Sequence, residues 1–171
     1  MGWTSRTSFE SSLCEDRGLP LAWPLHLDRL SDLVKDPAVI IAKAPAPGWF
    51  DEGVTRGYWG QAAEKAIRAI TGGTAKRFSL GTAAIPSFRI LDDFVDSGRA
   101  KVANEVKTGD GRLTSFVKRQ IAKDKWLVDN GRVTDYTRNF FPSARSNLVG
   151  PDPALLAELK ENGMMVKVWL P

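Results

Sequence analysis

The chain of 171 residues contains one cysteine, Cys14, and one histidine, His26. A single cysteine forms no internal disulfide and builds no cysteine-rich zinc site. A single histidine excludes multi-histidine metal sites and disfavours nucleases that depend on histidine. Any metal must therefore be held by oxygen ligands, which favours a hard cation such as Mg²⁺ or Mn²⁺.

Long apolar runs are also missing. No run approaches the roughly 20 residues that span a bilayer, and the N-terminus does not have the pattern of a signal peptide. We therefore expect no membrane span, and either a cytosolic protein or a fragment whose export information lies elsewhere. The formal net charge of +4 and the pI of about 9.3 are compatible with a nucleic-acid partner.

The domain organisation is suggested by one strong break. Residues 44–48 read Ala-Pro-Ala-Pro-Gly, a composition typical of a linker. The sequence therefore predicts a partly helical N-terminal appendage over residues 1–50 and one main domain over residues 51–171.

Periodicity and turn residues divide the main domain into helices and strands. The expected elements are a helix over 58–70, a strand over 75–80, strands over 88–95 and 99–107, a helix over 113–129, a strand over 133–141, a helix over 153–161 and a strand over 164–170. This order predicts an α/β fold whose mixed sheet follows the order αβββαβ, with helices on both faces and a further C-terminal helix and strand.

The two central strands flank the turn Asp96-Ser97-Gly98. Three-residue hairpin loops favour glycine at the last position, which predicts that Val95 and Arg99 close the loop. In this register Arg89 lies opposite Glu105.

The same register places Ser87 opposite Lys107. Because side chains alternate along a strand, Glu105 and Lys107 share one face. A carboxylate, an ammonium group and a hydroxyl are therefore expected to meet at one end of the hairpin, although an ordinary solvated strand face would also explain the two charges.

In this element order, Ile85-Pro86-Ser87 and Glu105-Val106-Lys107 resemble the PD-(D/E)xK restriction-endonuclease-like superfamily. The segments 104–109, 113–115 and 119–124 are similar to restriction-endonuclease-fold toxin domains of bacterial polymorphic and contact-dependent toxins. The resemblance implies a restriction-endonuclease-like core and a metal-dependent endonuclease that acts as an interbacterial toxin. It also implies secretion into the cytoplasm of a target cell as part of a larger toxin, and an acidic immunity protein as partner.

The resemblance further implies roles for individual residues. Glu105 would be a metal ligand, Lys107 the catalytic lysine and Glu64 an outer metal ligand, while Gln120 and Lys123 would orient the site or touch phosphate. The chemistry needs these types, because a divalent cation polarises a phosphoryl oxygen and lowers the pKa of bound water. A nearby lysine can orient the nucleophile or stabilise developing charge.

The family's metal-binding aspartate falls on Ser87. Asp93 lies roughly 13 Å along the strand from the position opposite Glu105, too far to share a cation with it. Asp92 points to the other face of a regular strand, unless a bulge turns it back. Serine is a poor ligand for a hard cation, so the sequence predicts a disabled enzyme, by engineering or by nature, in which Ser87→Asp restores cleavage.

The second predicted helix is basic. Its expected phosphate contacts, sequence-independent and salt-sensitive, are Arg112, Lys118, Arg119 and Lys123. Arg138 could extend that surface. The expected substrate is DNA or tRNA. A noncatalytic nucleic-acid-binding or partner-binding module on the same fold remains an alternative, since a solvated helix face can be equally basic.

Overall fold

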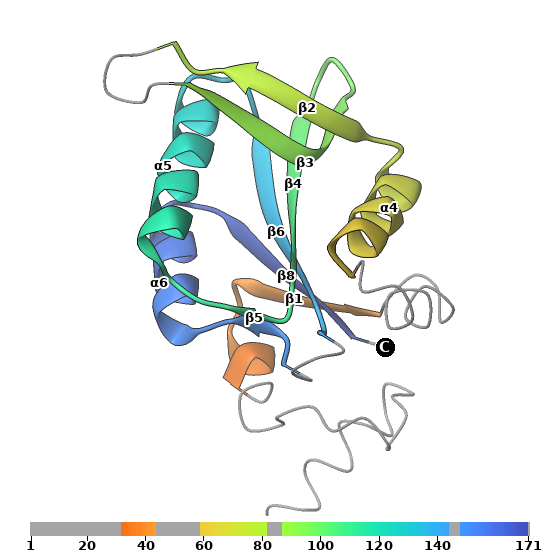
Figure 1. Ribbon diagram of the computed structural model, residues 1–171, viewed down its shortest axis with the longest axis vertical. Coiled ribbons are helices and arrows are strands. Elements are labelled where there is room, and N and C mark those ends of the chain that lie inside the picture. Colours follow the sequence, from red (N-terminus) through yellow and green to blue (C-terminus); the bar gives the residue numbers. More distant parts are fainter. Residues whose placement is uncertain (1–31, 44–58, 82–86, 144–147, 171) are drawn as a thin grey trace, which may run out of the picture.

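The computed structural model describes residues 32–43, 59–81, 87–143 and 148–170 (Figure 1). Its centre is a six-stranded sheet in the order β1-β8-β6-β4-β3-β2. The strands are β1 (Val39–Lys43), β2 (Thr74–Ser79), β3 (Phe88–Asp96), β4 (Lys101–Thr108), β6 (Asp135–Phe141) and β8 (Met165–Leu170). The short strands β5 (Asp110–Gly111) and β7 (Gly150–Pro151) pair separately. The helices are α4 (Trp59–Thr71), α5 (Ser115–Asp129) and α6 (Pro153–Glu161), and residues 32–35 form one further helical turn.

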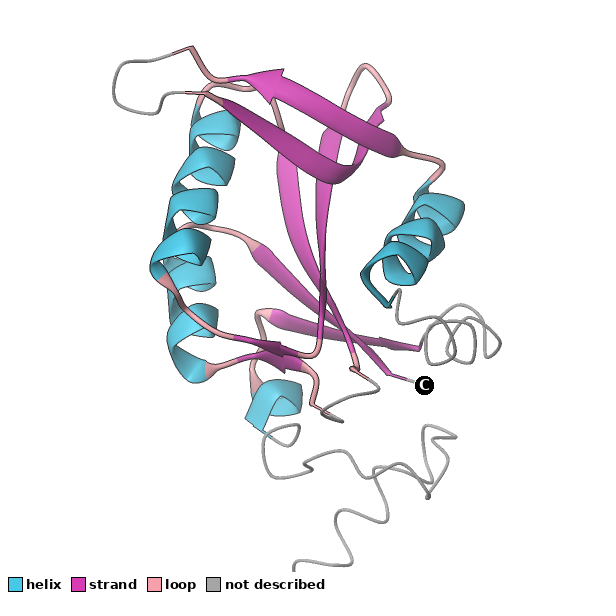
Figure 2. Ribbon diagram, viewed as in Figure 1, coloured by secondary structure: helices cyan, strands magenta, loops and turns pink. Residues whose placement is uncertain are grey.

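The sheet is mixed, as predicted. Strands β2, β3 and β4 are antiparallel, whereas β4, β6, β8 and β1 run parallel to one another. Parallel neighbours need a crossover connection; α5 lies in the connection from β4 to β6, and α6 in that from β6 to β8. In Figure 2 these two helices cover one face of the sheet and α4 lies on the other, which confirms the predicted α/β layering.

Two apolar cores hold these layers together. The larger core contains Ile121 and Leu127 of α5 and Leu155 and Leu159 of α6, all almost fully buried against the sheet. The smaller one packs Ala63 and Ile67 of α4 on the opposite face, against Val106, Phe141 and Trp169. Burying each Ile or Leu side chain contributes about 1.5–3 kcal/mol. These apolar stripes explain why periodicity located all three helices to within two residues.

The start of α6 shows how local sequence sets an element boundary. The carboxylate of Asp152 accepts a hydrogen bond from the Leu155 backbone N–H at 2.6 Å, and Pro153 occupies the first turn. Both are preferred helix-start features, because they satisfy or avoid unpaired backbone donors. The helix begins where the sequence predicted it to begin.

The N-terminal part differs from the prediction. Residues 39–43, assigned above to an appendage, form β1 at the edge of the main sheet, parallel to β8. Leu33 and Val39 lie in the larger core. The run Val39-Ile40-Ile41 is β-branched and therefore suits a strand, and its partner strand is far away in the sequence. The proposed linker at 44–48 and the segment before residue 32 lie outside the described residues.

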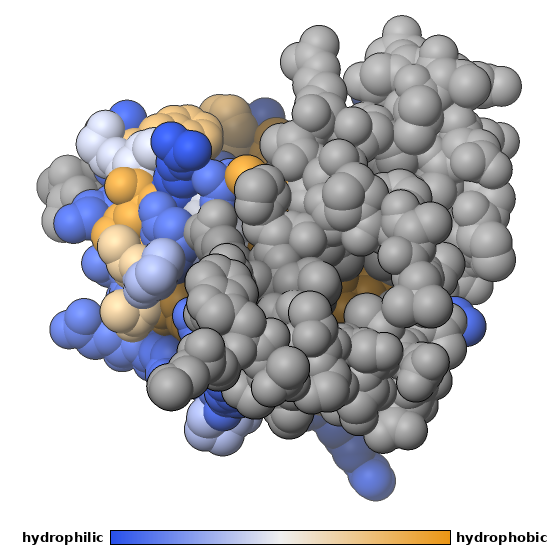
Figure 3. Space-filling view, turned by 90° about the horizontal axis from the view of Figure 1, so that it is seen from below, coloured by the Kyte–Doolittle hydropathy of each residue, from blue (hydrophilic) through white to orange (hydrophobic). Residues whose placement is uncertain are grey.

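Among the described residues, no helix has both the length and the apolar composition needed to cross a membrane. In the view from below, the described surface mixes hydrophilic side chains with smaller apolar areas (Figure 3).

Candidate active site

The β3–β4 hairpin has a different register from the predicted one. Asp96 pairs with Lys101, so the loop has four residues, and the predicted closure by Val95 and Arg99 is wrong. The reason is local hydrogen bonding: the Ser97 hydroxyl accepts from the Ala100 N–H at 3.1 Å and donates to the Ala100 carbonyl at 3.2 Å. These side-chain bonds stabilise the longer turn, and they move every cross-strand pair by three positions.

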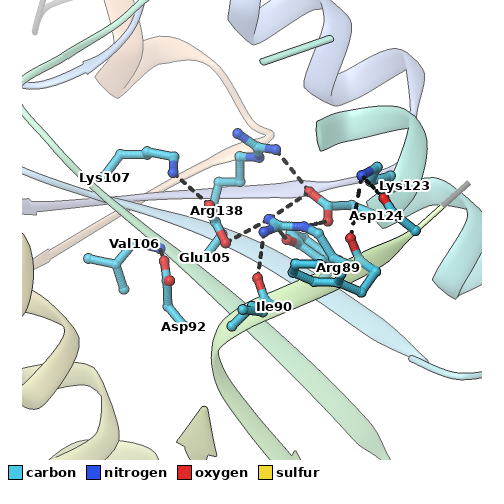
Figure 4. Close-up of polar contacts among 12 residues, drawn as sticks. Arg89, Ile90, Asp92, Glu105, Val106, Lys107, Lys123, Asp124 and Arg138 are labelled. Carbon is cyan, nitrogen blue, oxygen red and sulfur yellow. Dashed lines mark hydrogen bonds and ion pairs between the residues drawn. The ribbon is translucent and has the colours of Figure 1, made fainter. Parts of the chain in front are cut away.

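Strand β3 also contains a bulge. Phe94 pairs with Thr74 of β2, but Leu91 pairs with Lys76, so β3 has one residue more than its partner between these points. The pairing of β3 with β4 ends at Asp93, which pairs with Asn104, and the strands part beyond it. A bulge bends its strand and re-aims a side chain. Here the carboxylate of Asp92 turns to β4, where its Oδ2 accepts the N–H of Val106 at 2.8 Å (Figure 4).

This geometry places Asp92, and not Ser87, next to the Glu105-Val106-Lys107 tripeptide. Val106 lies between Glu105 and Lys107, so Asp92 is the carboxylate beside that tripeptide. Ser87 precedes Asp92 by five residues, roughly 16 Å along an extended strand. Its hydroxyl instead accepts a hydrogen bond from Lys123 Nζ of α5 at 3.1 Å. The structure therefore does not bring Ser87 to Glu105 and Lys107.

Glu105 is held by two cations. Its side chain is 2% exposed; Oε1 accepts from Lys107 Nζ at 2.6 Å and Oε2 from Arg89 Nη2 at 2.7 Å (Figure 4). Burial alone would raise the pKa of Glu105, but the charges of Lys107 and Arg89 outweigh it and lower that pKa. Glu105 is therefore ionised at neutral pH. Arg89 contacts Glu105, as expected. The two residues are not directly opposite each other in the observed register, and the long side chain of Arg89 bridges the offset.

A buried ionic network supports this arrangement from behind. Arg89 also binds Asp124 of α5 and the Tyr136 hydroxyl, and Asp124 accepts from Arg138 Nη2 at 2.9 Å. Burial disfavours the charge on Arg89, yet its carboxylate neighbours raise its pKa, so it stays protonated. Arg138 is fully buried and does not extend an exposed basic surface. Asp124 interrupts the apolar stripe between Ile121 and Leu127, which is the sequence signal that could have revealed it.

Among the described residues, no cation bonds to the carboxylate of Asp92. Burial, and then the like charge of Glu105, raise the pKa of Asp92 to about 6, against the lowering effects of the Val106 N–H and of Lys107. Glu64 of α4 raises it further. Arg68 links Glu64 to Asp92, because it donates to the Glu64 carboxylate at 3.1 Å and to the Asp92 backbone carbonyl at 2.9 Å. We call Glu64, Asp92, Glu105 and Lys107 the carboxylate cluster.

The other predicted site residues lie on or near α5. The Gln120 Oε1 atom is buried and has no hydrogen-bond partner among the described residues. Lys118 and Arg119 are exposed, and Arg112 is exposed but paired with Asp110 at 2.8 Å. A phosphate-contacting role for these basic side chains remains a prediction.

Asp92 and Glu105 are the two carboxylates of the cluster that flank Val106, and they are the candidates for direct metal ligands. Within the described ranges, no group of three histidine, cysteine, aspartate or glutamate side chains is placed to hold an ion. Mg²⁺ is usually held by one or two carboxylates together with water and substrate phosphates. Both oxygens of Glu105 already accept hydrogen bonds, from Lys107 and Arg89, so a hard cation held by Asp92 and Glu105 together with water and substrate remains a prediction.

The sequence and the fold of the whole chain can be compared with those of known proteins. Comparisons with protein-family models, with curated proteins and with solved structures give no match. Function must therefore be inferred from the chemistry that Asp92, Glu105 and Lys107 can perform.

Proposed function

We propose that this chain is a metal-dependent endonuclease that hydrolyses phosphodiester bonds of DNA or RNA. The observation that carries the proposal is the position of Asp92, whose carboxylate binds the N–H between Glu105 and Lys107. With Asp92 in the aspartate position, the pattern Asp…Glu-x-Lys is complete. The proposal therefore drops the expectation of a disabled enzyme that rested on Ser87.

The element order supports a restriction-endonuclease-like core. From α4 to β6 the chain runs helix, three antiparallel strands, helix and parallel strand, which is the order implied by the resemblance. The cluster lies where β3 and β4 part.

Each member of the cluster has a chemical role. Asp92 and Glu105 would hold Mg²⁺ or Mn²⁺, and Glu64 would act as an outer ligand. The bound cation would polarise a phosphoryl oxygen and lower the pKa of a water molecule. Lys107 is 32% exposed, so its ammonium group reaches solvent and can stabilise the charge that develops on the phosphate. Arg89 fixes Glu105 through Oε2 and thereby orients Oε1.

The test is cleavage by the purified chain. Plasmid DNA, total tRNA and single-stranded RNA are incubated with the protein in Mg²⁺, Mn²⁺ or EDTA. We expect metal-dependent cleavage that is lost in Asp92→Asn and Lys107→Met. The matched control is Asp129→Asn, which removes an exposed carboxylate that pairs with Lys125. Absence of cleavage of every substrate in every metal refutes the proposal, and binding without cleavage favours the noncatalytic module.

The biological setting is proposed on the resemblance alone. Secretion as part of a larger toxin, and neutralisation by an acidic immunity protein, are consistent with a basic chain of formal charge +4. Induced expression in bacterial cells tests the toxin role. Growth should stop with the wild-type chain and continue with Asp92→Asn at equal protein levels; equal growth in both refutes toxicity.

A further inference from the structure

Within the described part of the chain, the sheet face beside α4 includes exposed apolar side chains on β3. In β3, Arg89 and Leu91 are buried on the α5 side, whereas Phe88 and Ile90 face the other way and are 42% and 47% exposed. Helix α4 lies over the later part of the strand, where Arg68 reaches the Asp92 carbonyl. Among the described residues, Phe88 and Ile90 therefore form a small exposed apolar area at the start of β3, beside the exposed Arg77 of β2.

Cations are interleaved with this apolar surface. Arg77 of β2 is exposed and pairs with Ile90, and its guanidinium carbon lies 3.8 Å from the centroid of the Phe88 ring. On the α5 side, Lys123 Nζ lies 3.4 Å from the Phe88 carbonyl oxygen. The Phe88 ring thus has the guanidinium group of Arg77 against it, and the ammonium group of Lys123 lies close to the Phe88 backbone on the other side of the sheet.

We infer that Arg77, Phe88 and Ile90 form a stacking platform for unpaired bases of a single-stranded nucleic acid. The inference rests on the proposed function, whose substrate class it narrows. Every base has a π face that stacks on aromatic rings and on arginine planes, and this contact does not depend on sequence. Bases inside a duplex do not offer that face. The positive charge of Arg77, which lies against the Phe88 ring, complements a backbone phosphate.

The position of the platform matches the path of a substrate to the cluster. Phe88 and Asp92 are four residues apart on β3, roughly 13 Å along the strand. A few nucleotides span that distance. A base stacked on Phe88 would therefore hold the same nucleic-acid strand within reach of Asp92.

The test separates binding from cleavage. In the Asp92→Asn background and in EDTA, fluorescence anisotropy measures binding of a labelled single-stranded DNA, a single-stranded RNA of the same sequence and the corresponding duplex. We expect Phe88→Ala to weaken single-strand binding about 5- to 150-fold, and Phe88→Trp to retain it. The matched control is Phe116→Ala, since Phe116 is 60% exposed on α5; it should bind like the parent. The DNA and RNA arms identify which strand is preferred.

The outcomes distinguish the two proposals. Equal binding by Phe88→Ala and Phe116→Ala overturns the platform, as does a loss confined to duplex or no binding by the parent. Phe88-dependent binding with no cleavage by the wild-type chain supports the platform and refutes the nuclease. Thermal melting verifies folding, which Phe88→Ala should preserve because the side chain is largely exposed.

Discussion

Replacing Asp92 by asparagine should abolish cleavage and at the same time stabilise the protein at neutral pH. The pKa of Asp92 is raised to about 6, against about 3.9 for an unperturbed aspartate. Asparagine removes the charge but retains an oxygen that can accept the Val106 N–H. The variant therefore loses the cost of burying an ionised group and keeps the hydrogen bond.

The magnitude follows from the shift in pKa. A difference of about two pH units at about 1.4 kcal/mol per unit gives an upper limit of about 3 kcal/mol. Asp92 is only partly buried, so solvent screening reduces this value. We expect Asp92→Asn to raise the free energy of unfolding by about 1–2 kcal/mol at pH 7.5, which is a rise in melting temperature of about 2–8 °C for a domain of this size.

The size of the stability difference between Asp92→Asn and the wild-type chain depends on pH. Because the folded pKa is the higher one, the stability contributed by protonated Asp92 is fully present below about pH 4 and is lost as the pH rises through about 6. The advantage of Asp92→Asn over the wild-type chain should therefore be largest above pH 7 and should vanish near pH 4.

The assay is urea denaturation followed by circular dichroism at several values between pH 4 and pH 8. The exposed carboxylate of Asp129 provides the control, and Asp129→Asn should change stability by less than about 0.5 kcal/mol at every pH. Destabilisation by Asp92→Asn at pH 7.5, or a difference from wild type that does not depend on pH, would refute the reasoning.

Three further outcomes follow from the cluster and its support. Mg²⁺ or Mn²⁺ should raise the melting temperature of the wild-type chain, more strongly at pH 7 than at pH 5 as Asp92 ionises, and an equal rise in Asp92→Asn would contradict metal binding at this site. Asp124→Asn should cost about 3–5 kcal/mol in urea denaturation, because it leaves Arg89 and Arg138 buried without their shared carboxylate; a cost below about 1 kcal/mol would show that the network is dispensable. Ser87→Asp should leave the cleavage rate unchanged, since that hydroxyl faces Lys123, and a large gain would restore the original assignment.

Much of the fold was predictable because its signals are local. Helices α4, α5 and α6 bury regular stripes such as Ala63 and Ile67, so their spacing in the sequence reports the face that packs. Strand β1 was missed because its evidence is not local. Its short β-branched run gains a partner only from β8, at the other end of the described chain.

The proximity of Glu105 and Lys107 was predictable from local sequence, but the position of Asp92 was not. Glu105 and Lys107 lie two residues apart on one strand, so their proximity follows from strand geometry alone. The partner carboxylate depends on the loop length set by Ser97 and on the bulge before Phe94. Neither feature has a pattern that hydrophobic periodicity reports, and together they bring Asp92, in place of Ser87, next to Val106.

The two carboxylates of the site differ in a way that stability alone does not explain. Glu105 is buried but neutralised by Arg89 and Lys107, and its pKa is lowered. Asp92 accepts one backbone N–H, has no cation bonded to its carboxylate among the described residues, and has its pKa raised by burial and by Glu105. A neutral side chain at position 92 could accept the same N–H without that electrostatic cost. A raised carboxylate pKa beside a second carboxylate, at a bulge where two strands part, is a combination typical of functional sites. The missing positive charge at Asp92 is what a divalent cation would supply.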